Sequence, residues 1–310
     1  MNNNPLVSVI IPVFNCEQWV ERSIKSVQNQ SYNNIEVIVV DDGSKDSSGL
    51  LCDIMSEKDP RVKVIHQPNG GVNEARRKGV ERAVGDWLMF VDADDTIDED
   101  CVSHYLSLVN KKSDIVATGK VNEVLSWDKY CLKLLSGEIR PGLVEKLFSA
   151  DLFKKHEVAL ERELVMGEDL ILNLAVGKYA QCIISTDKAL YKVNKENPAS
   201  ATNSFKKTWR YEKYYFSNLF RYFMDGLEES PSYNDLLLLV RKSQLNGIKY
   251  LMLDGNKVEY NDKEFKELQS YYKSKKNQFV MSERLIFQLK NPLIYKTILK
   301  AYLRLTHKNK

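Results

Sequence analysis

The chain has 310 residues, of which 43% are hydrophobic and 28% are charged. This length and composition indicate a soluble globular protein with a buried core, built from one large and one smaller domain or from two ordinary ones. No apolar run reaches the roughly 18 residues of a membrane-spanning helix, and the start MNNNPLVSVIIPVF lacks the basic segment and cleavage site of a signal peptide. We therefore expect neither a spanning helix nor secretion.

Charge is distributed unevenly along the chain, although the net formal charge is only +3. Residues 206–310 contain 21 lysines and arginines against 11 acids, whereas the remainder contains 24 against 31. This asymmetry predicts chemistry in the acidic first part and an anionic surface met by the basic last part. The five cysteines stand far apart without metal-ligand pairs, which suits a reducing cytoplasm, and the four histidines form no metal set.

Apolar runs and helical patterns alternate over the first part of the chain. We expect strands at 6–14, 35–40, 62–66 and 87–91, with helices at 16–30, 47–57 and 72–84. Asn15 is the expected N-cap of the first helix. Strands and helices that alternate with short links predict a parallel sheet covered by helices, and the ligands of such sheets bind at the carboxyl ends of the strands.

The pattern loosens after residue 113. We expect a strand at 114–119, irregular chain at 120–142, helices at 143–160 and 166–180, and short strands at 182–185 and 189–193. From about Phe205 the pattern is helical and aromatic, which sets a domain boundary there. The predicted fold class is α/β, with a mostly parallel sheet flanked by helices at 1–205 and a smaller α-helical domain at 206–310.

The strongest chemical signal is the acidic stretch after the fourth expected strand, in WLMFVDADDTIDED. Strand residues two positions apart point to the same side, so Asp92 and Asp94 are expected to converge on a divalent cation such as Mg²⁺ or Mn²⁺. The alternative is that the acids cap and charge a helix at 98–112, which we accept for the three acids at 98–100.

Two further polar segments follow expected strands at the same edge of the sheet. VVDDGSKDSS is common turn-and-cap chemistry, but a carboxylate there could also accept the imide N–H of uracil. NGGVNEARRKG places two glycines and Arg76 at a helix start, where backbone N–H groups and a guanidinium would suit a diphosphate.

Gly167, Glu168 and Asp169 open the helix expected at 166–180. Acids in a first helical turn complement the helix dipole, and a carboxylate here could equally act as a general base toward an attacking hydroxyl. The spacing does not decide between these two roles.

Three segments together resemble the bacterial family 2 glycosyltransferases with their GT-A nucleotide-sugar-binding fold. They are VSVIIPVFNCEQWVERSIKSVQNQSYNNIEVIVVDDGSKDSS, NGGVNEARRKGVERAVGDWLMFVDADD and GEDLILNLAV. The motifs follow one another in the expected order, and the resemblance covers about residues 5–205. KLFSADLF resembles the acceptor-side segment of the family that precedes the last motif.

The resemblance implies a role for each motif. The loop after the first strand would line the nucleotide pocket, and Asp41 would read the uracil edge. Asp94 and Asp92 would hold the divalent cation, Mn²⁺ or Mg²⁺, while Asp169 would be the catalytic base supported by Glu168. The residues implied to bind the nucleotide sugar are Pro12, Val13, Phe14, Asn15, Glu17, Asp41, Asp42, Gly43, Ser44, Asn69, Gly70, Arg76, Asp92, Ala93 and Lys192.

These implied roles describe a direct displacement with inversion. The cation and Arg76 would stabilise the charge that develops on the leaving nucleoside diphosphate, while Asp169 would activate an acceptor hydroxyl on the opposite face. One departure is that several members carry His or Arg where ALYKVNKENPASAT has Lys192, Asn194 and Lys195. This departure leaves a third protein ligand for the cation open and offers Lys192 to the diphosphate instead.

The end of the chain is strongly basic, with ten lysines and arginines and one acid in residues 271–310. A basic and an apolar face are expected on its last helix, formed respectively by Lys296, Lys300 and Arg304 and by Tyr295, Ile298, Leu299 and Tyr302. Such a helix could lie on an anionic membrane surface, or its apolar face could pack on the enzyme or on a second copy of the chain. The expected location is the cytoplasm, either free or at the inner face of the cell membrane.

The resulting hypothesis is an inverting, metal-dependent enzyme that moves a hexose or N-acetylhexosamine from a nucleotide sugar to a hydroxyl. The expected donor is a UDP-sugar, and the acceptor is a glycan, lipid-linked or protein-linked molecule of bacterial surface polysaccharide or glycoprotein synthesis. The alternative is a nucleotide- or glycan-binding assembly subunit that has lost catalysis. A nucleotidyltransferase is disfavoured because IPVFNCEQ offers no basic triphosphate loop, and nucleic acid is not an expected partner.

Overall fold

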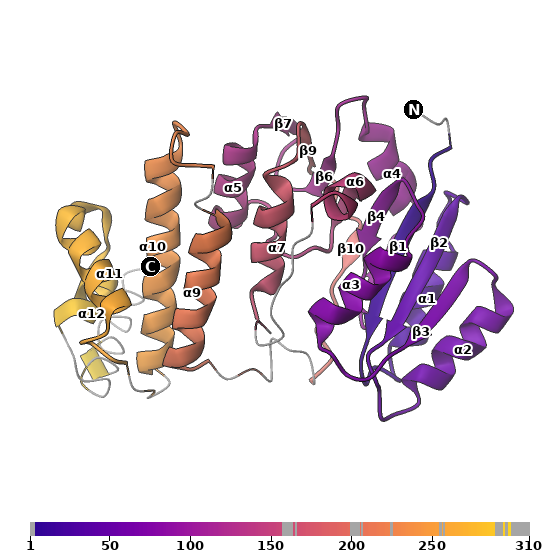
Figure 1. The fold of residues 1–310 in the computed structure, drawn as a ribbon, viewed down its shortest axis with the longest axis horizontal. Helices are drawn as coiled ribbons and strands as arrows, with labels where there is room; N and C mark the ends of the chain where they lie inside the picture. Colours follow the sequence, from indigo (N-terminus) through magenta and orange to yellow (C-terminus); the bar gives the residue numbers. More distant parts are fainter. Residues whose placement is uncertain are drawn as a thin grey trace, which may run out of the picture. The chain divides into compact units, whose positions relative to one another are not determined.

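The computed structural model describes residues 4–156, 164, 166–198, 205, 207–223, 226–253, 256, 258–288, 294 and 297–298. The chain divides into two compact units, residues 1–204 and residues 205–310, and each is described by itself. The first unit is built from strands and helices, whereas the described part of the second is helical (Figure 1).

A mixed sheet of eight described strands forms the centre of the first unit, in the order β3-β2-β1-β4-β8-β6-β9-β7 (Figure 1). Its strands are β1 (Val7–Val13), β2 (Ile35–Asp41), β3 (Val62–His66), β4 (Trp87–Phe90), β6 (Ile115–Thr118), β7 (Glu123–Leu125), β8 (Lys146–Ser149) and β9 (Ile183–Thr186). β1 to β4 run parallel, and β8 lies antiparallel between β4 and β6. The predicted α/β class is therefore confirmed.

Helices cover both faces of the parallel part of the sheet, and β1 is buried on both of its faces except at the half-buried Pro12. On one face, the odd-numbered residues of β1 share a core with the apolar stripe of α1 (Val20–Gln28). On the other face, α3 (Val72–Arg82) approaches so closely that a Cβ on Gly79 would lie 2.4 Å from Ile10 Cγ2. The chain between β2 and β3 forms α2 (Ser48–Lys58).

The register of the parallel strands brings the loops that follow them to one edge of the sheet. Val13 of β1 pairs with Asp41 of β2, and Asp41 pairs with His66 of β3. β4 pairs with β1 up to Phe90 beside Ile10. The loops that begin after these four residues therefore start side by side, as the sequence predicts.

The first helix is shorter than predicted, and Asn15 is not its N-cap. α1 begins at Val20, and Trp19 occupies the N-cap position without a side-chain cap. Asn15 instead has a left-handed backbone, with φ of 49°, and its side-chain oxygen accepts from the Lys45 backbone N–H at 2.8 Å. The side chain thus serves the loop after β2 rather than the helix.

The segments between 120 and 160 also differ from the prediction. The stretch expected to be irregular contains β7 and α5 (Trp127–Ser136). The helix expected at 143–160 begins as β8 and continues as α6 (Ala150–Lys154), and residues 157–160 lie outside the described part of the chain. A short apolar run suits a strand or a buried helix equally, and here pairing with β4 and β6 makes it a strand.

The helix expected at 98–112 is shorter, and Asp100 occupies its N-cap position without a side-chain cap. A short strand, β5 (Thr96–Ile97), pairs with β10 (Tyr191–Lys192), and α4 spans only Cys101–Leu108. Asp98 and Asp100 form ion pairs with Lys192 and Lys188, and no side-chain cap is present at the start of α4. The expected helix before β9 is present as α7 (Glu168–Gly177).

The second unit packs α9 (Trp209–Phe223), α10 (Tyr233–Leu253), α11 (Lys263–Ser274) and α12 (Met281–Gln288) around its own apolar core. Asp262 caps α11 by accepting from the Glu264 backbone N–H at 3.1 Å. The predicted basic face at Lys296, Lys300 and Arg304 lies outside the described residues. Across the described chain, no helix is both long and apolar enough to span a membrane.

Candidate active site

The loop after β1 is joined to the loop after β2 by reciprocal hydrogen bonds. Asn15 N–H donates to Ser44 Oγ at 3.0 Å, and Lys45 N–H donates back to Asn15 Oδ1 at 2.8 Å. Two residues further along, Ser47 N–H donates to the Glu17 carboxylate at 2.9 Å. Backbone donors and side-chain acceptors therefore hold the two predicted nucleotide loops against each other.

Asp41, the residue expected to read uracil, lies buried at the end of β2. Its Oδ1 accepts from Ser44 N–H at 3.0 Å, and its Oδ2 lies 2.9 Å from His66 Nδ1. The other nitrogen of His66 lies 3.0 Å from Asp53 Oδ1. Burial alone would raise the pKa of Asp41, but the bonds to Ser44 and His66 lower it below its ordinary value. Hydrogen bonds to Asp41 and Asp53 raise the pKa of His66, so this imidazole orients the carboxylate.

Asp42 holds the glycine loop that follows β3. Its Oδ1 accepts from Gly70 N–H at 2.7 Å, and its Oδ2 accepts from Gly71 N–H at 2.8 Å. Gly43 has a φ of 74°, and a Cβ there would lie 2.8 Å from the Asn69 nitrogen. A side chain at this position would separate the two loops, so glycine is needed both for the backbone conformation and for the close approach.

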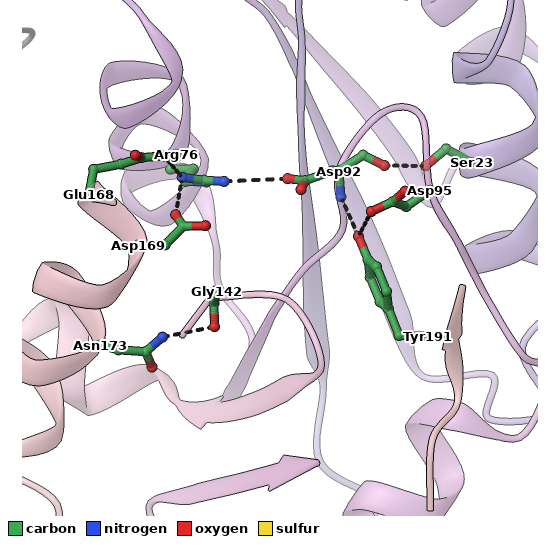
Figure 2. Close-up of polar contacts among 9 residues, drawn as sticks. All are labelled: Ser23, Arg76, Asp92, Asp95, Gly142, Glu168, Asp169, Asn173 and Tyr191. Carbon is green, nitrogen blue, oxygen red and sulfur yellow. Dashed lines mark hydrogen bonds and ion pairs between the residues drawn. The ribbon is translucent and has the colours of Figure 1, made fainter. Parts of the chain in front are cut away.

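The acidic stretch after β4 is a turn, because β4 ends at Phe90 and Asp95 N–H donates to Asp92 O at 3.0 Å. The strand alternation expected to aim Asp92 and Asp94 at one side therefore does not apply. The Tyr191 hydroxyl accepts from Asp92 N–H at 3.1 Å and donates to Asp95 Oδ2 at 2.7 Å (Figure 2). Ser23 Oγ also donates to Asp92 O at 3.1 Å, so neighbouring elements hold the turn from two sides.

The segment after β10 reaches the same turn. Asn197 Nδ2 donates to Asp94 Oδ2 at 2.8 Å, and Asn194 N–H donates to Asp95 Oδ1 at 2.6 Å. Lys192, expected at the diphosphate, has its ammonium in an ion pair with Asp98. The structure thus brings Asn197, rather than Lys192, onto the predicted cation ligand Asp94.

Arg76 joins the turn after β4 to the start of α7. Its Nη1 lies 2.5 Å from Asp169 Oδ1 and 3.3 Å from Glu168 Oε1, and its Nη2 lies 3.3 Å from Asp92 Oδ1 (Figure 2). The guanidinium is nearly buried, with 5% of the side chain exposed. Four residues that the sequence places in three separate motifs therefore meet, and the arginine expected at a diphosphate binds carboxylates here.

Three acids around one arginine leave an excess of negative charge, and the pKa values respond. Burial and the neighbouring Asp169 raise the pKa of Glu168 to about 7, against the opposing effect of Arg76. Burial also raises the pKa of Asp92 to about 6, with contributions from Asp169 and the other acids of the turn. The Asp92 side chain is 39% exposed, so water also reaches its carboxylate. The three carboxylates raise the pKa of Arg76 above its ordinary value although burial opposes this.

The remaining predicted residues border these groups. Pro12 is half-buried and Val13 is buried at the end of β1, whereas 47% of Phe14 is exposed on the loop that follows. Ala93 is buried within the acidic turn. Asn69 stands at the contact between the glycine loop and Gly43.

Sequence reasoning missed several polar residues of the site. Tyr191 and Asn197 stabilise the acidic turn, and Asn173 and Lys146 hold a loop beside Asp169. Asn173 could have been found, because it lies four residues after Asp169 and thus on the same face of the helix. Lys146 carried no signal, since a lysine next to an acid in a short apolar run is usually on the surface.

The donor set suits a hard divalent cation shared with a substrate. Within the described residues, no group of three or more His, Cys, Asp or Glu side chains is arranged to hold a metal ion by itself. Mg²⁺-type ions commonly take only one or two protein carboxylates and complete their shell with substrate phosphates and water. The carboxylates of Asp92 and Asp94 are donors of this kind and number.

The α/β unit thus gathers acidic side chains in loops at one edge of its sheet, where ligands of such sheets bind. Residues 8–146 match the family model described as Glycosyl transferase family 2, so this part of the chain is similar to that family. The GT-A fold expected from the resemblance is confirmed by Staphylococcus aureus TarS, whose structure of residues 1–349 with UDP-GlcNAc matches with a TM-score of 0.66. The match covers 96% of this chain and 92% of that one at 17% identity.

Similar sequences carry glycosyltransferase names. A glycosyltransferase named EpsJ from Bacillus subtilis strain 168 is 29% identical over 218 residues, which cover 64% of this chain and 63% of that protein. The glycosyltransferase GlyA of Streptococcus pneumoniae serotype 4 is 32% identical over 210 residues, covering 60% of this chain and 30% of that protein. The chain therefore spans less than two thirds of the length of these relatives.

Proposed function

We propose that the chain is an inverting, metal-dependent glycosyltransferase that moves a sugar from UDP to a hydroxyl of a glycan, lipid-linked or protein-linked acceptor. The observation that supports this most strongly is the Arg76 cluster, which brings the acidic turn after β4 to Asp169 at the start of α7. A cation- and diphosphate-binding segment then stands beside a carboxylate that can take a proton from the attacking hydroxyl.

The acceptor side of this reaction depends on Asp169. Arg76 binds its Oδ1 and so orients the carboxylate, which leaves Oδ2 to accept the proton of the acceptor hydroxyl. Glu168 shares the same arginine and supports that arrangement. Attack opposite the leaving diphosphate inverts the anomeric centre, so an α-linked donor yields a β-linked product.

The donor side is formed by the loops after β1, β2 and β3. Asp41, oriented by His66, would accept the imide N–H of uracil, and the exposed Phe14 would contact the base. Asp94 and Asp92 would hold Mn²⁺ or Mg²⁺, which when bound neutralises charge on the diphosphate. Because the TarS structures contain UDP and UDP-GlcNAc, hexose and N-acetylhexosamine esters of UDP are the first donors to test.

Nucleotide release tests the proposal. The purified chain is incubated with Mn²⁺ and a panel of UDP-, GDP- and dTDP-sugars, and we expect release of UDP. Asp94→Ala and Asp169→Asn should abolish release, while Asp169→Asn should still bind UDP because the base does not contact the nucleotide. UDP binding by the wild type without release from any donor would instead favour the catalytically silent binding subunit.

The basic C-terminal unit is proposed to place the enzyme, either by contacting an anionic membrane at the inner face of the cell membrane or by joining two copies. All five cysteines are free thiols, which agrees with a cytoplasmic location. Sedimentation with anionic vesicles distinguishes the two roles. Loss of sedimentation on deletion of residues 289–310, which keeps α12 and the apolar core, supports the membrane, whereas unchanged sedimentation together with a smaller native mass supports self-association.

A further inference from the structure

A buried lysine holds the loop at residues 140–144 by hydrogen bonds. Lys146 of β8 is fully buried, and its Nζ donates to the carbonyl oxygens of Arg140 at 2.7 Å, Gly142 at 2.5 Å and Val144 at 3.4 Å. A buried ammonium needs such acceptors, because desolvation without hydrogen bonds costs several kcal/mol. The loop carbonyl groups therefore satisfy the buried Lys146 side chain, and Lys146 in turn holds the loop backbone.

The same loop is held from the side by the helix that carries the proposed base. Asn173 of α7 is fully buried, and its Nδ2 donates to Pro141 O at 2.6 Å and to Gly142 O at 2.8 Å (Figure 2). Its Oδ1 accepts from the Tyr130 hydroxyl at 3.0 Å, which fixes the orientation of the amide. Gly142 is thus bonded by two buried side chains that come from different elements.

Gly142 lies against the oxygen of Asp169 that Arg76 does not bind. A Cβ added to Gly142 would lie 3.6 Å from Asp169 Oδ2, and 24% of the Asp169 side chain is exposed. Figure 2 shows Gly142 on the side of Asp169 away from Arg76. A hydroxyl bound to Oδ2 would lie about 2.7 Å from that oxygen, and on the Gly142 side of the carboxylate the carbon that carries it would lie close to Gly142.

We propose that Gly142 determines which hydroxyls reach Asp169, and that Lys146 and Asn173 are positioning residues that hold its backbone in place. This inference rests on the proposed function and describes the acceptor seat of that same site. A residue without a side chain leaves room for a hydroxyl whose carbon is substituted on both sides, as in a sugar ring. A methyl group at position 142 would leave room for water but not for such a carbon.

The variant Gly142→Ala isolates this effect from folding. The added Cβ would meet Val144 Cγ2 at 3.4 Å and Asp169 Oδ2 at 3.6 Å, which are ordinary van der Waals contacts. The chain therefore accommodates the methyl without a shift. A control is Lys129→Ala, which changes an exposed residue of α5 that takes no part in the contacts described above.

The experiment compares transfer to water with transfer to larger hydroxyl compounds. Each variant is incubated with the active UDP-sugar and Mn²⁺ in water containing methanol, 2-propanol, glucose or N-acetylglucosamine, and products are resolved by mass spectrometry. In Gly142→Ala we expect hydrolysis within about threefold of wild type, and formation of 2-propyl and sugar glycosides about tenfold lower or less, the effect of one methyl group in a pocket. Lys129→Ala should match the wild type.

The outcomes separate this inference from the proposed function. A wild type that releases no UDP from any donor overturns the proposed function. A wild type that hydrolyses the donor but makes no glycoside, or a Gly142→Ala variant with the wild-type ratio of glycoside to hydrolysis, overturns the role of Gly142.

The positioning role is tested by Lys146→Met, which keeps the side-chain length and removes the donors. We expect the ratio of glycoside to hydrolysis to change about tenfold or more while the Kd for UDP stays the same. A merely structural role would lower the unfolding midpoint and weaken UDP binding without changing that ratio. If Lys146→Met does not fold, Asn173→Ala, which removes two of the five bonds to the loop, takes its place with the same criterion.

Discussion

Replacing Arg76 by methionine would remove the counterion that three carboxylates share. The guanidinium lies 2.5 Å from Asp169 and 3.3 Å from both Glu168 and Asp92, and only 5% of its side chain is exposed. Methionine keeps most of the apolar stem, so the change acts mainly on charge and hydrogen bonds. Removing one member of a buried ion pair costs about 3–5 kcal/mol, because the remaining charge stays buried without a partner.

The exposure of the acids places the Arg76→Met effect at the lower end of this range. Side-chain exposures of 39% for Asp92 and 24% for Asp169 allow water to screen those two, whereas Glu168 is 11% exposed. We therefore expect the free energy of unfolding to fall by about 3 kcal/mol at pH 8. That is a large part of the 5–15 kcal/mol typical of a domain, so the variant should remain folded but be clearly less stable.

The pH dependence distinguishes lost charge pairing from lost packing. The folded pKa of Glu168 is about 7, against 4.5 without the fold, so the folded chain binds more protons between these values. The destabilising effect of the charged, buried Glu168 carboxylate is fully present above pH 7 and disappears as the pH falls below 4.5. Without Arg76 the pKa of Glu168 rises further, so the deficit of Arg76→Met should be larger at pH 8 than at pH 5.

Urea unfolding followed by tryptophan fluorescence at pH 5 and pH 8 measures this. Trp19, Trp87 and Trp127 report on residues 1–204, while Trp209 reports on the second unit. Arg76→Lys is the matched control, because it keeps the charge but cannot bridge three carboxylates, and it should lie between wild type and Arg76→Met. A deficit that is the same at both pH values would refute the charge argument.

Three further changes test other parts of the site. Tyr191→Phe removes the hydroxyl that joins Asp92 N–H to Asp95, so the free energy of unfolding should fall by about 1–3 kcal/mol in urea titration and UDP release should slow. Unchanged values would contradict the role of this hydroxyl in holding the turn. Asp42→Ala removes the carboxylate that accepts from the backbone N–H groups of the glycine loop, so calorimetry should show weaker UDP binding. The free energy of unfolding should fall by about 1–3 kcal/mol, as for Tyr191→Phe. Gly79→Ala gains about 1 kcal/mol of helix propensity but forces a 2.4 Å contact with Ile10 Cγ2, so overpacking of about 1–3 kcal/mol should prevail in chemical denaturation. In an Ile10→Ala background, which lacks that carbon, Gly79→Ala should no longer destabilise, and an equal loss in both backgrounds would contradict the overpacking.

The parallel half of the fold could be predicted because its strands are buried on both faces. β1 and β2 contain the consecutive apolar runs 9–13 and 37–40, which favour strands buried on both faces. The β8 strand could not be predicted in this way. Its four residues have the pattern of a helix segment as much as of a strand, and only the neighbours β4 and β6 decide. The error at Asn15 has a similar origin, since its partner Lys45 lies 30 residues away.

The positions of the site residues could be predicted, but not their partners. Each motif is local, and the carboxyl ends of parallel strands lie at one edge of the sheet, so the placement of Asp41 and Asp92 at that edge follows from topology. Which acid Arg76 binds is a different question, because Asp169 lies 93 residues away in a helix that the sheet order alone does not place. An arginine near the start of a helix could bind either a diphosphate or carboxylates, and the sequence is the same in both cases.

The two glycines Gly79 and Gly142 show that the sequence alone does not say why a position is a glycine. Both are glycines in ordinary backbone regions, so neither is required by a left-handed turn. A Cβ on Gly79 would strike Ile10 at 2.4 Å, whereas a Cβ on Gly142 would only touch Val144 and Asp169 at 3.4 and 3.6 Å. Packing therefore accounts for the first glycine and not for the second. A glycine that packing does not require, held by buried Lys146 and Asn173 beside an exposed carboxylate oxygen, is what keeping room for a substrate would look like.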